Sequence, residues 1–209
     1  MLVHVLVTTD TLSGVWTYTQ ELVTGLVSRG ARITLVSLGD IPLPEQTFWM
    51  EAYKVVCELT LKIREFRPQV VLTFGPEGGV TGHTDHSMAS IFATLAFHWA
   101  GRSNRYPDQF SDRIRPHRVH KLYHATANFT LPDRQPVTPS PITAVIEVGA
   151  YLETKIEAFR AHTTQAPLFQ MFESRMRQYG GQERFHLAAS MVAAPVQTET
   201  DLFGGIEKN

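Results

Sequence analysis

The feature that most constrains the fold is the alternation of short apolar runs with amphipathic stretches. Residues 2–7 and 33–38 are almost continuously apolar, which is typical of strands covered on both faces of a sheet. Between them, residues 15–27 carry apolar side chains at helical spacing, and Gly30 is a natural stop. This opening of about 38 residues is the unit from which parallel sheets with helical crossovers are built.

The alternation continues along the chain. The pattern predicts helices over residues 52–66, 87–100 and 151–162, and strands over residues 70–74, 119–125 and 142–148. Residues 101–117 are predicted to form a surface loop, and the tail after Gln165 has mixed signals. We therefore expect residues 1–209 to form a single α/β domain, with a three-layer, Rossmann-like and mostly parallel sheet.

Charge and composition exclude several classes of function. The chain has 19 basic and 20 acidic residues, so there is no electrostatic basis for binding nucleic acid. Its single cysteine, Cys57, excludes an internal disulfide framework and a cysteine-based zinc site. No apolar stretch approaches the roughly 20 residues that cross a bilayer, and residues 2–7 do not form a secretory signal. We expect a cytoplasmic protein, and a homo-oligomer is left open.

The densest polar cluster is Gly82-His83-Thr84-Asp85-His86, between a glycine-rich loop and a predicted helix. In open α/β sheets ligands bind beyond the carboxyl ends of strands, which selects residues 8–14, 39–40 and 75–86. His83 and His86 can face the same side of a helix start. A neutral imidazole is a good zinc ligand, and a zinc-bound hydroxide can attack an amide. The alternative is structural, because carboxylates complement the dipole at helix N-termini and such histidine pairs also occur by chance.

Three separated segments resemble, in order, the zinc-dependent N-deacetylases of the LmbE/PIG-L family. Residues 74–86 resemble the family's Gly-His-x-Asp-His motif after a glycine-rich loop. Residues 63–72 are similar to its lead-in, and residues 155–165 to a late segment that ends in Ala-His-x-(Ser/Thr)-Gln. The resemblance covers about residues 53–205 and implies an LmbE-like fold.

The resemblance implies zinc-dependent removal of an acetyl or acyl group from a small amino-sugar conjugate, such as an N-acetylglucosaminyl compound. It implies that His86 is a zinc ligand, His83 the catalytic histidine and Asp85 its orienting carboxylate. Substrate contacts are implied for Gly78, Gly79 and His162.

The first motif of the family is not matched. The family opens with a strand followed by Ala-His-Pro-Asp-Asp, in which the histidine and the second aspartate bind zinc and the first aspartate is the general base. Here Thr8 and Thr11 occupy the two ligand positions, and Asp10 occupies the position of the base. A catalytic zinc normally has three protein ligands. His86 is then the one family ligand that this sequence retains.

Residues 1–51 resemble the start of a GT-B glycosyltransferase of the GT4 class, in residues 8–18 and 44–50. In those enzymes the glycine after the first strand lies at the interdomain cleft, a role that Gly14 would match. The rest of the chain is not the sugar-nucleotide domain that glycosyl transfer requires. The hypothesis is a fused chain in which this strand-helix-strand segment completes the sheet of a deacetylase region over residues 53–205.

Three functions are left open by the sequence. The first is an active metal-dependent deacetylase in which Asp10 joins His86 as a ligand. The second is an inactive hybrid or pseudoenzyme that keeps the fold and binds a sugar. The third is a carbohydrate-binding or partner protein that uses the glycine-rich cleft.

Overall fold

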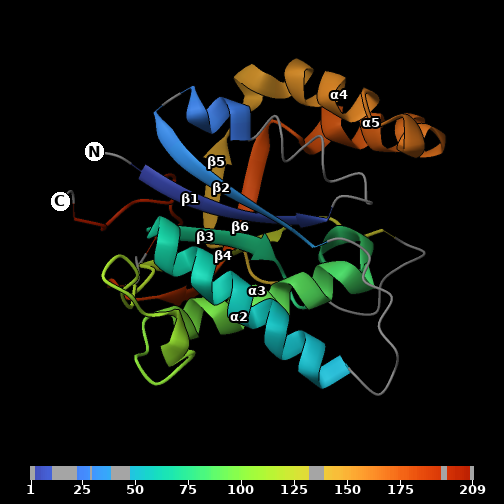
Figure 1. Cartoon of the computed structure of the whole chain (residues 1–209). Coiled ribbons are helices and arrows are strands. Elements are labelled where there is room, and N and C mark those ends of the chain that lie inside the picture. The colour runs from blue at the N-terminus through green and yellow to red at the C-terminus, as the bar shows by residue number, and fades with distance from the viewer. Residues whose placement is uncertain are drawn as a thin grey trace.

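The computed structural model describes residues 3–10, 23–28, 30–38, 48–131, 139–193 and 197–207 (Figure 1). The strands are β1 (Val3–Asp10), β2 (Ala31–Leu38), β3 (Val70–Phe74), β4 (Lys121–Thr126), β5 (Ala144–Glu147) and β6 (Gln182–Ser190). The helices are α2 (Phe48–Phe66), α3 (Thr84–Ala100), α4 (Leu152–Arg160) and α5 (Phe169–Tyr179), and residues 23–27 are also helical. Short 3₁₀ turns are η2 (Gly79–Thr81), η3 (Pro107–Gln109), η4 (Gly149–Tyr151) and η5 (Thr163–Leu168).

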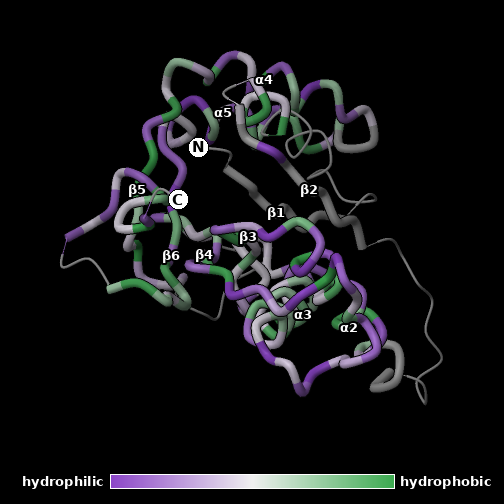
Figure 2. The backbone as a smooth tube through the Cα atoms, turned by 60° about the vertical axis from the view of Figure 1, so that its left-hand side comes forward, coloured by the Kyte–Doolittle hydropathy of each residue, from purple (hydrophilic) through white to green (hydrophobic). Residues whose placement is uncertain are grey.

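The strands form one six-stranded sheet in the order β2-β1-β3-β4-β6-β5. Strands β2, β1, β3 and β4 are parallel, and β6 runs antiparallel to both of its neighbours. Helices α2 and α3 cover one face of the sheet, and α4 and α5 lie on the other (Figures 1 and 2). The predicted three-layer, mostly parallel α/β fold is confirmed.

The larger core lies between the sheet and the pair of helices α2 and α3. Val56, Leu59 and Ile63 recur at helical spacing along α2 and are at most 1% exposed. They pack in one cluster with Phe97 of α3 and Leu122 of β4. Three alanines of α3 are also buried: Ala93, Ala96 and Ala100. Because their side chains are small, α2 and α3 can approach each other closely.

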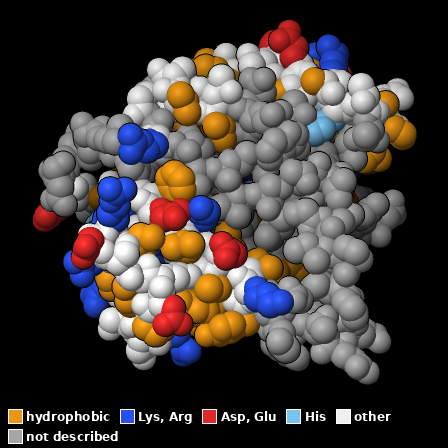
Figure 3. Space-filling view, in the orientation of Figure 1, with side chains coloured by type: hydrophobic (Ala, Val, Ile, Leu, Met, Phe, Trp, Pro, Cys, Tyr) orange, Lys and Arg blue, Asp and Glu red, His pale blue; other side chains and the backbone are white. Residues whose placement is uncertain are grey.

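Two further observations concern the molecular surface and the apolar character of the helices. On the face drawn in Figure 3, acidic and basic side chains are interspersed over the part of the chain that the structure describes. Among the described helices, none combines the length and the apolar character that a membrane span requires.

The long connection from α3 to β4 is organised around a buried arginine. Arg64 of α2 is fully buried and donates hydrogen bonds to Gln109 Oε1 and to a ring of backbone carbonyl oxygens. The carbonyl groups belong to Trp99, Ala100, Arg102, Arg105 and Tyr106. The predicted loop over residues 101–117 is observed, with η3 inside it, and the forked guanidinium holds it against α2.

Some element boundaries differ from the sequence-based expectation. The strand predicted over residues 2–7 is too short, because β1 continues to Asp10 in parallel register with β2. Pairing with a neighbouring strand outweighs the local polarity of these residues. Helix α2 begins four residues before the predicted position 52, and the predicted helix over 151–162 is observed as η4 followed by α4. Helix α5 and strand β6 lie in the tail after Gln165, where the sequence signals are mixed.

A buried ion pair attaches the C-terminal segment to the sheet. Lys121 Nζ pairs with the carboxylate of Glu199, and their side chains are 1% and 6% exposed. Tyr123 Oη donates a second hydrogen bond to Glu199 Oε2 at 2.6 Å. The backbone of Glu199 also bonds to Thr143 and Val145 beside β5. Removing one partner of such a pair leaves a buried charge without compensation.

We expect Glu199→Ala to lower the free energy of unfolding by about 3–5 kcal/mol, because Lys121 would then be buried without its carboxylate. Urea denaturation measures this change. Glu65→Ala is the matched control, because Glu65 belongs to an exposed pair with Lys62 and should change stability by less than about 1 kcal/mol. Equal effects of the two substitutions would contradict a stabilising role for the buried pair.

Candidate functional site

The carboxyl ends of the parallel strands bring the candidate site together at one edge of the sheet. Strands β1, β3 and β4 end there at Asp10, Phe74 and Thr126. The chain leaves β3 through a glycine-rich loop and enters α3 at Thr84. This is the edge at which open α/β sheets bind ligands.

Gly78 makes the return of this loop possible. Its backbone has φ 87°, in the left-handed region that favours glycine. A Cβ atom at this position would lie 2.7 Å from both the carbonyl carbon of Gly82 and the carbonyl oxygen of His83. The loop therefore folds back closely enough for the His83 amide to donate to the Gly78 carbonyl oxygen at 3.2 Å.

His86 is held firmly in the first turn of α3. Its side chain is buried and stacks on Phe74, with the ring centroids 3.9 Å apart and the planes 3° from parallel. His86 Nδ1 lies 3.1 Å from the Gly78 carbonyl oxygen and 3.5 Å from Thr81 Oγ1. Because a carbonyl oxygen only accepts, Nδ1 carries the proton and Nε2 carries the lone pair of the neutral ring.

His83 and Asp85, at the same helix start, are more exposed to solvent than His86. His83 is the N-cap residue of α3, and its Nδ1 accepts the backbone N–H of Asp85 at 3.2 Å. The neutral ring therefore has its proton on Nε2, opposite to the arrangement in His86. An Asp85 carboxylate oxygen lies 3.6 Å from His83 Nδ1. The His83 and His86 ring centroids are 5.3 Å apart.

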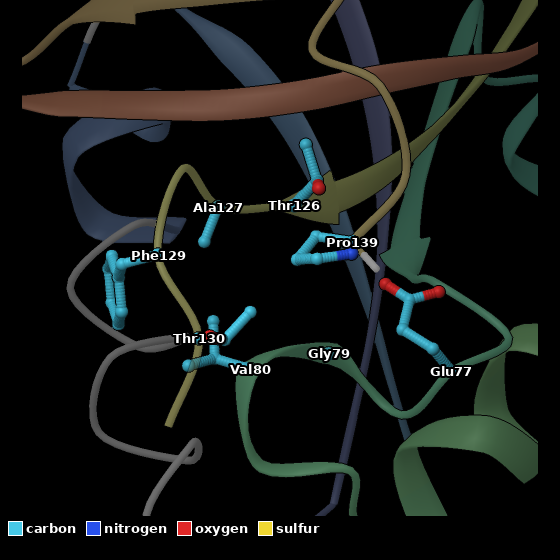
Figure 4. Close-up of a pocket in the computed structure, with 8 residues that line it drawn as sticks. All are labelled: Glu77, Gly79, Val80, Thr126, Ala127, Phe129, Thr130 and Pro139. Atoms are coloured by element: carbon cyan, nitrogen blue, oxygen red, sulfur yellow. The ribbon is translucent and has the colours of Figure 1, made fainter. Parts of the chain in front are cut away.

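A groove begins beside this cluster. Its inner part is drawn in Figure 4 and is lined by Glu77, Gly79, Val80, Thr126, Ala127, Phe129, Thr130 and Pro139. Four of these residues also line a neighbouring cavity of about 180 Å³ that extends to α5 and the start of β6: Val80, Thr126, Ala127 and Phe129. We refer to the two connected spaces as the groove.

The remaining predicted site residues are placed as follows. Gly79 lines the groove, and a Cβ atom there would lie 3.8 Å from His86 Nδ1. The backbone of Asp10 ends β1 at the same edge of the sheet, but its side chain and all of Gly14 lie outside the described residues. His162 precedes η5 and is not among the residues that line the groove. Partial burial lowers the pKa of its imidazole.

Zinc, which the resemblance implies, is matched by one described residue. His86 has the buried position, the carbonyl partner at Nδ1 and the lone pair at Nε2 that a histidine ligand needs. Within the described ranges, however, no three His, Cys, Asp or Glu side chains form a group that could hold a metal ion. The described residues therefore do not by themselves provide the three protein ligands of a catalytic zinc site.

Several residues of the groove were missed by sequence reasoning. The outer cavity takes its lining from α5 and β6, which the sequence did not predict: Phe172, Arg175, Met176, Tyr179, Gln182, Glu183 and Arg184. Their signal was weak because α5 has no buried residue, and β6 is only half-buried along its length. Residues 155–165, with His162 as an implied substrate contact, are the part of this region that the sequence singles out.

The fold and the Gly-His-x-Asp-His helix start are the features expected of the LmbE/PIG-L family. The chain matches no protein-family profile. It is 30% identical over 196 residues to 1D-myo-inositol 2-acetamido-2-deoxy-alpha-D-glucopyranoside deacetylase 2 of Catenulispora acidiphila, covering 77% of this chain and 64% of the relative. It is 29% identical over 200 residues to mycothiol S-conjugate amidase of Streptomyces coelicolor, covering 80% and 66%. The chain is therefore a homologue of the LmbE/PIG-L deacetylases, and it spans just under two thirds of these two relatives.

A solved structure agrees with this fold. N,N'-diacetylchitobiose deacetylase from Pyrococcus horikoshii, complexed with an inhibitor, matches with a TM-score of 0.55 and 17% identity. The match covers 89% of this chain and 72% of that one. At this identity the likeness concerns the fold alone. The resemblance of residues 1–51 to glycosyltransferases stays a prediction.

Strand β4 also carries a buried histidine, His124, one strand away from Phe74. Its side chain is 8% exposed, and burial together with the nearby His186 lowers its pKa to about 4. The unfolded chain, with an ordinary histidine pKa near about 6.5, binds a proton more tightly than the folded chain does. Stability is therefore lost as the pH falls from about 6.5 towards about 4.

We expect Gly78→Ala to lower the free energy of unfolding by about 1–3 kcal/mol, because alanine is strained at this φ and its Cβ would meet backbone atoms. Urea denaturation measures the loss. Gly25→Ala is the control: Gly25 is helical, and nothing lies within 4 Å of the position that an added methyl group would take. It should be neutral or stabilising by about 0.5–1 kcal/mol, and a Gly78→Ala protein of unchanged stability would contradict the strained loop.

We expect His124→Leu to flatten the acid dependence of stability. The wild-type free energy of unfolding should fall by on the order of 3 kcal/mol more than that of His124→Leu between pH 7 and pH 4. Denaturation curves across this range measure the difference in slope, which does not depend on the stability of either protein at pH 7. His98→Leu, at an exposed position of α3, should keep the wild-type slope. Parallel curves for wild type and His124→Leu would refute the assignment.

Proposed function

We propose that the chain is a zinc-dependent N-deacetylase that hydrolyses the amide of an N-acetylglucosaminyl-type substrate. The observation that carries the proposal is the grouping of His83, Asp85 and His86 at the start of α3, at the carboxyl ends of the parallel strands and beside Gly79 of the groove lining. Homology to deacetylases of N-acetylated glucosaminides supports the same substrate class. Because the chain spans less than two thirds of these relatives, the activity is a proposal for the chain as a whole.

The roles proposed for the described residues follow from their protonation. His83 presents an Nε2–H from a half-exposed ring, so it can donate to an amide oxygen or pass a proton to the leaving amine. Asp85 orients that ring, because its backbone N–H donates to Nδ1 and its carboxylate lies beside the same atom. Gly78 and Gly79 keep the approach to His86 free of side chains. His162 and Gly14 are proposed as substrate contacts on resemblance alone.

The metal site is proposed to be incomplete relative to the family. His86 is the ligand that the described residues offer, and Thr8 and Thr11 stand where the family has two more. Asp10, at the end of β1, is proposed as the second ligand. The alternative is a sugar-binding pseudoenzyme, and it is favoured by the same two threonines. A cytoplasmic location and a homo-oligomeric state stay predictions.

A related proposal concerns residues 1–51. We propose that residues 1–209 act as a single domain in which a glycosyltransferase-like first unit, residues 1–51, completes the deacetylase sheet. The parallel pairing of Val5, Leu6 and Val7 with β3 supports this, because it joins the two segments by a continuous ladder. Limited proteolysis that released two folded pieces near Ala52 would count against it.

The test of the proposed function is the zinc content of purified protein after zinc loading and dialysis. We expect about one zinc per chain in the wild type, as in other catalytic sites, and its loss in His86→Ala, with acetate release from N-acetylglucosaminides lost in parallel. His98→Ala, on the same helix but exposed, should retain both zinc and activity. A wild-type chain that retains no zinc would overturn the hydrolase proposal in favour of the sugar-binding alternative.

A further inference from the structure

The outer part of the groove has a chemical character of its own. It is formed by the loop after β4, the inner side of α5 and the first residues of β6. Its volume of about 180 Å³ is smaller than the roughly 300–1,000 Å³ of a site for a whole drug-sized ligand. It therefore suits one part of a conjugate whose other part lies at the histidines.

Two arginines, Arg175 and Arg184, line this outer cavity. Among the residues that the structure describes, neither Arg175 nor Arg184 takes part in an ion pair. The other charges nearby are compensated: Lys155 pairs with Glu183 inside the cavity, while Arg177, on the outer side of α5, pairs with Glu153 and Glu173. Counting the described residues alone, the outer cavity therefore carries uncompensated positive charge.

Both guanidinium groups are held in place by neutral partners. Arg184 donates to Gln182 Oε1 at 2.6 Å, and to the carbonyl oxygens of Gln182 and Tyr179 at 3.4 Å. Arg175 lies over the ring of Phe129, 5.7 Å from its centroid, and Phe129 stacks on Tyr179 at 5.0 Å. These contacts orient the two side chains and leave their charge unneutralised. A half-buried, oriented arginine is well suited to bind a carboxylate or a phosphate.

The cavity lined by the arginines shares part of its lining with the inner part of the groove, which includes Gly79 beside His86. Val80, Thr126, Ala127 and Phe129 line both the inner and the outer part of the groove, and Figure 4 shows these side chains around the inner part. Gly79, also in the inner lining, lies against His86. Among the described residues of the inner lining, Glu77 is the one carboxylate, and it does not line the outer cavity.

We propose that Arg175 and Arg184 are specificity-determining residues that bind an anionic group, a phosphate or a carboxylate, on the aglycone of the amino-sugar conjugate. The inference rests on the proposed function, because it assumes that the N-acetyl group lies at His83 and His86. It goes beyond that function by naming the charge of the remaining part of the ligand. The inositol glycoside in the name of the Catenulispora relative carries no acidic group, so the two proteins would differ in ligand charge.

Calorimetric titration of the whole, zinc-loaded chain tests this proposal. The probes are N-acetylglucosamine, its 1-phosphate, and a 4-carboxyphenyl N-acetylglucosaminide, with the uncharged phenyl glycoside as its reference. We expect at least one anionic probe to bind about 10-fold or more tighter than its neutral reference, as a charge-assisted hydrogen bond provides. The two anionic probes separate phosphate from carboxylate recognition.

The variants are Arg175→Gln and Arg184→Gln, with Arg177→Gln as the matched control on the outer side of α5. Each of the first two should remove most of the advantage of the anionic probe and leave binding of the neutral sugar within about 2-fold. Arg177→Gln should change neither. If Arg184→Gln is unstable by circular dichroism, Arg184→Lys keeps the positive charge and should keep part of the preference.

The outcomes separate the two proposals. Equal binding of anionic and neutral probes by the wild type would overturn the arginine subsite and leave the amino-sugar site standing. A preference that persists in both arginine variants would also overturn the subsite. A chain that binds none of the four probes would overturn the proposed function and this inference together.

Discussion

The Gly78 carbonyl group is the point around which the candidate site is built. Its oxygen accepts the amide of His83, which begins α3, and lies 3.1 Å from Nδ1 of His86, which is one turn further on. A single acceptor thus closes the loop, positions the helix start and selects the tautomer of the buried imidazole. The left-handed backbone at Gly78 is what turns this oxygen towards both histidines.

The part of the site that the sequence predicts well is local in the chain. Strand β3, the glycine loop and α3 follow one another within residues 70–100, so apolar runs, glycines and helix-start residues suffice to place them. The first strand extends past the predicted end at Val7 because pairing between β1 and β2 is not visible in either segment alone. Arg64 could be assigned to a helix, but its six acceptors come from residues 35 to 45 positions away.

The outer groove was not predictable for a different physical reason. Helix α5 buries no residue and β6 is only half-covered, so neither carries the strong periodic pattern that burial imposes on a sequence. In the sequence, Arg175 and Arg184 cannot be told from ordinary surface arginines. Only the structure shows that the carboxylates nearby already pair with other basic residues. The zinc question differs, because both the two threonines at the family's ligand positions and the candidate ligand His86 are plain from the sequence. The structure adds the hydrogen bond to the Gly78 carbonyl oxygen, which fixes the tautomer of His86.

The antiparallel direction of β6 has a consequence for how ligand choice can vary in this fold. In a wholly parallel sheet, the amino-terminal ends of the strands lie at the edge remote from the ligand. Because β6 is reversed, Arg184 near its start pairs with Thr126 at the carboxyl end of β4 and reaches the ligand-binding edge. One reversed strand would thus separate two tasks in space: the proposed reacting groups follow β3, while the start of β6 can change its charge without disturbing them. Selectivity and chemistry can then diverge independently within a common scaffold.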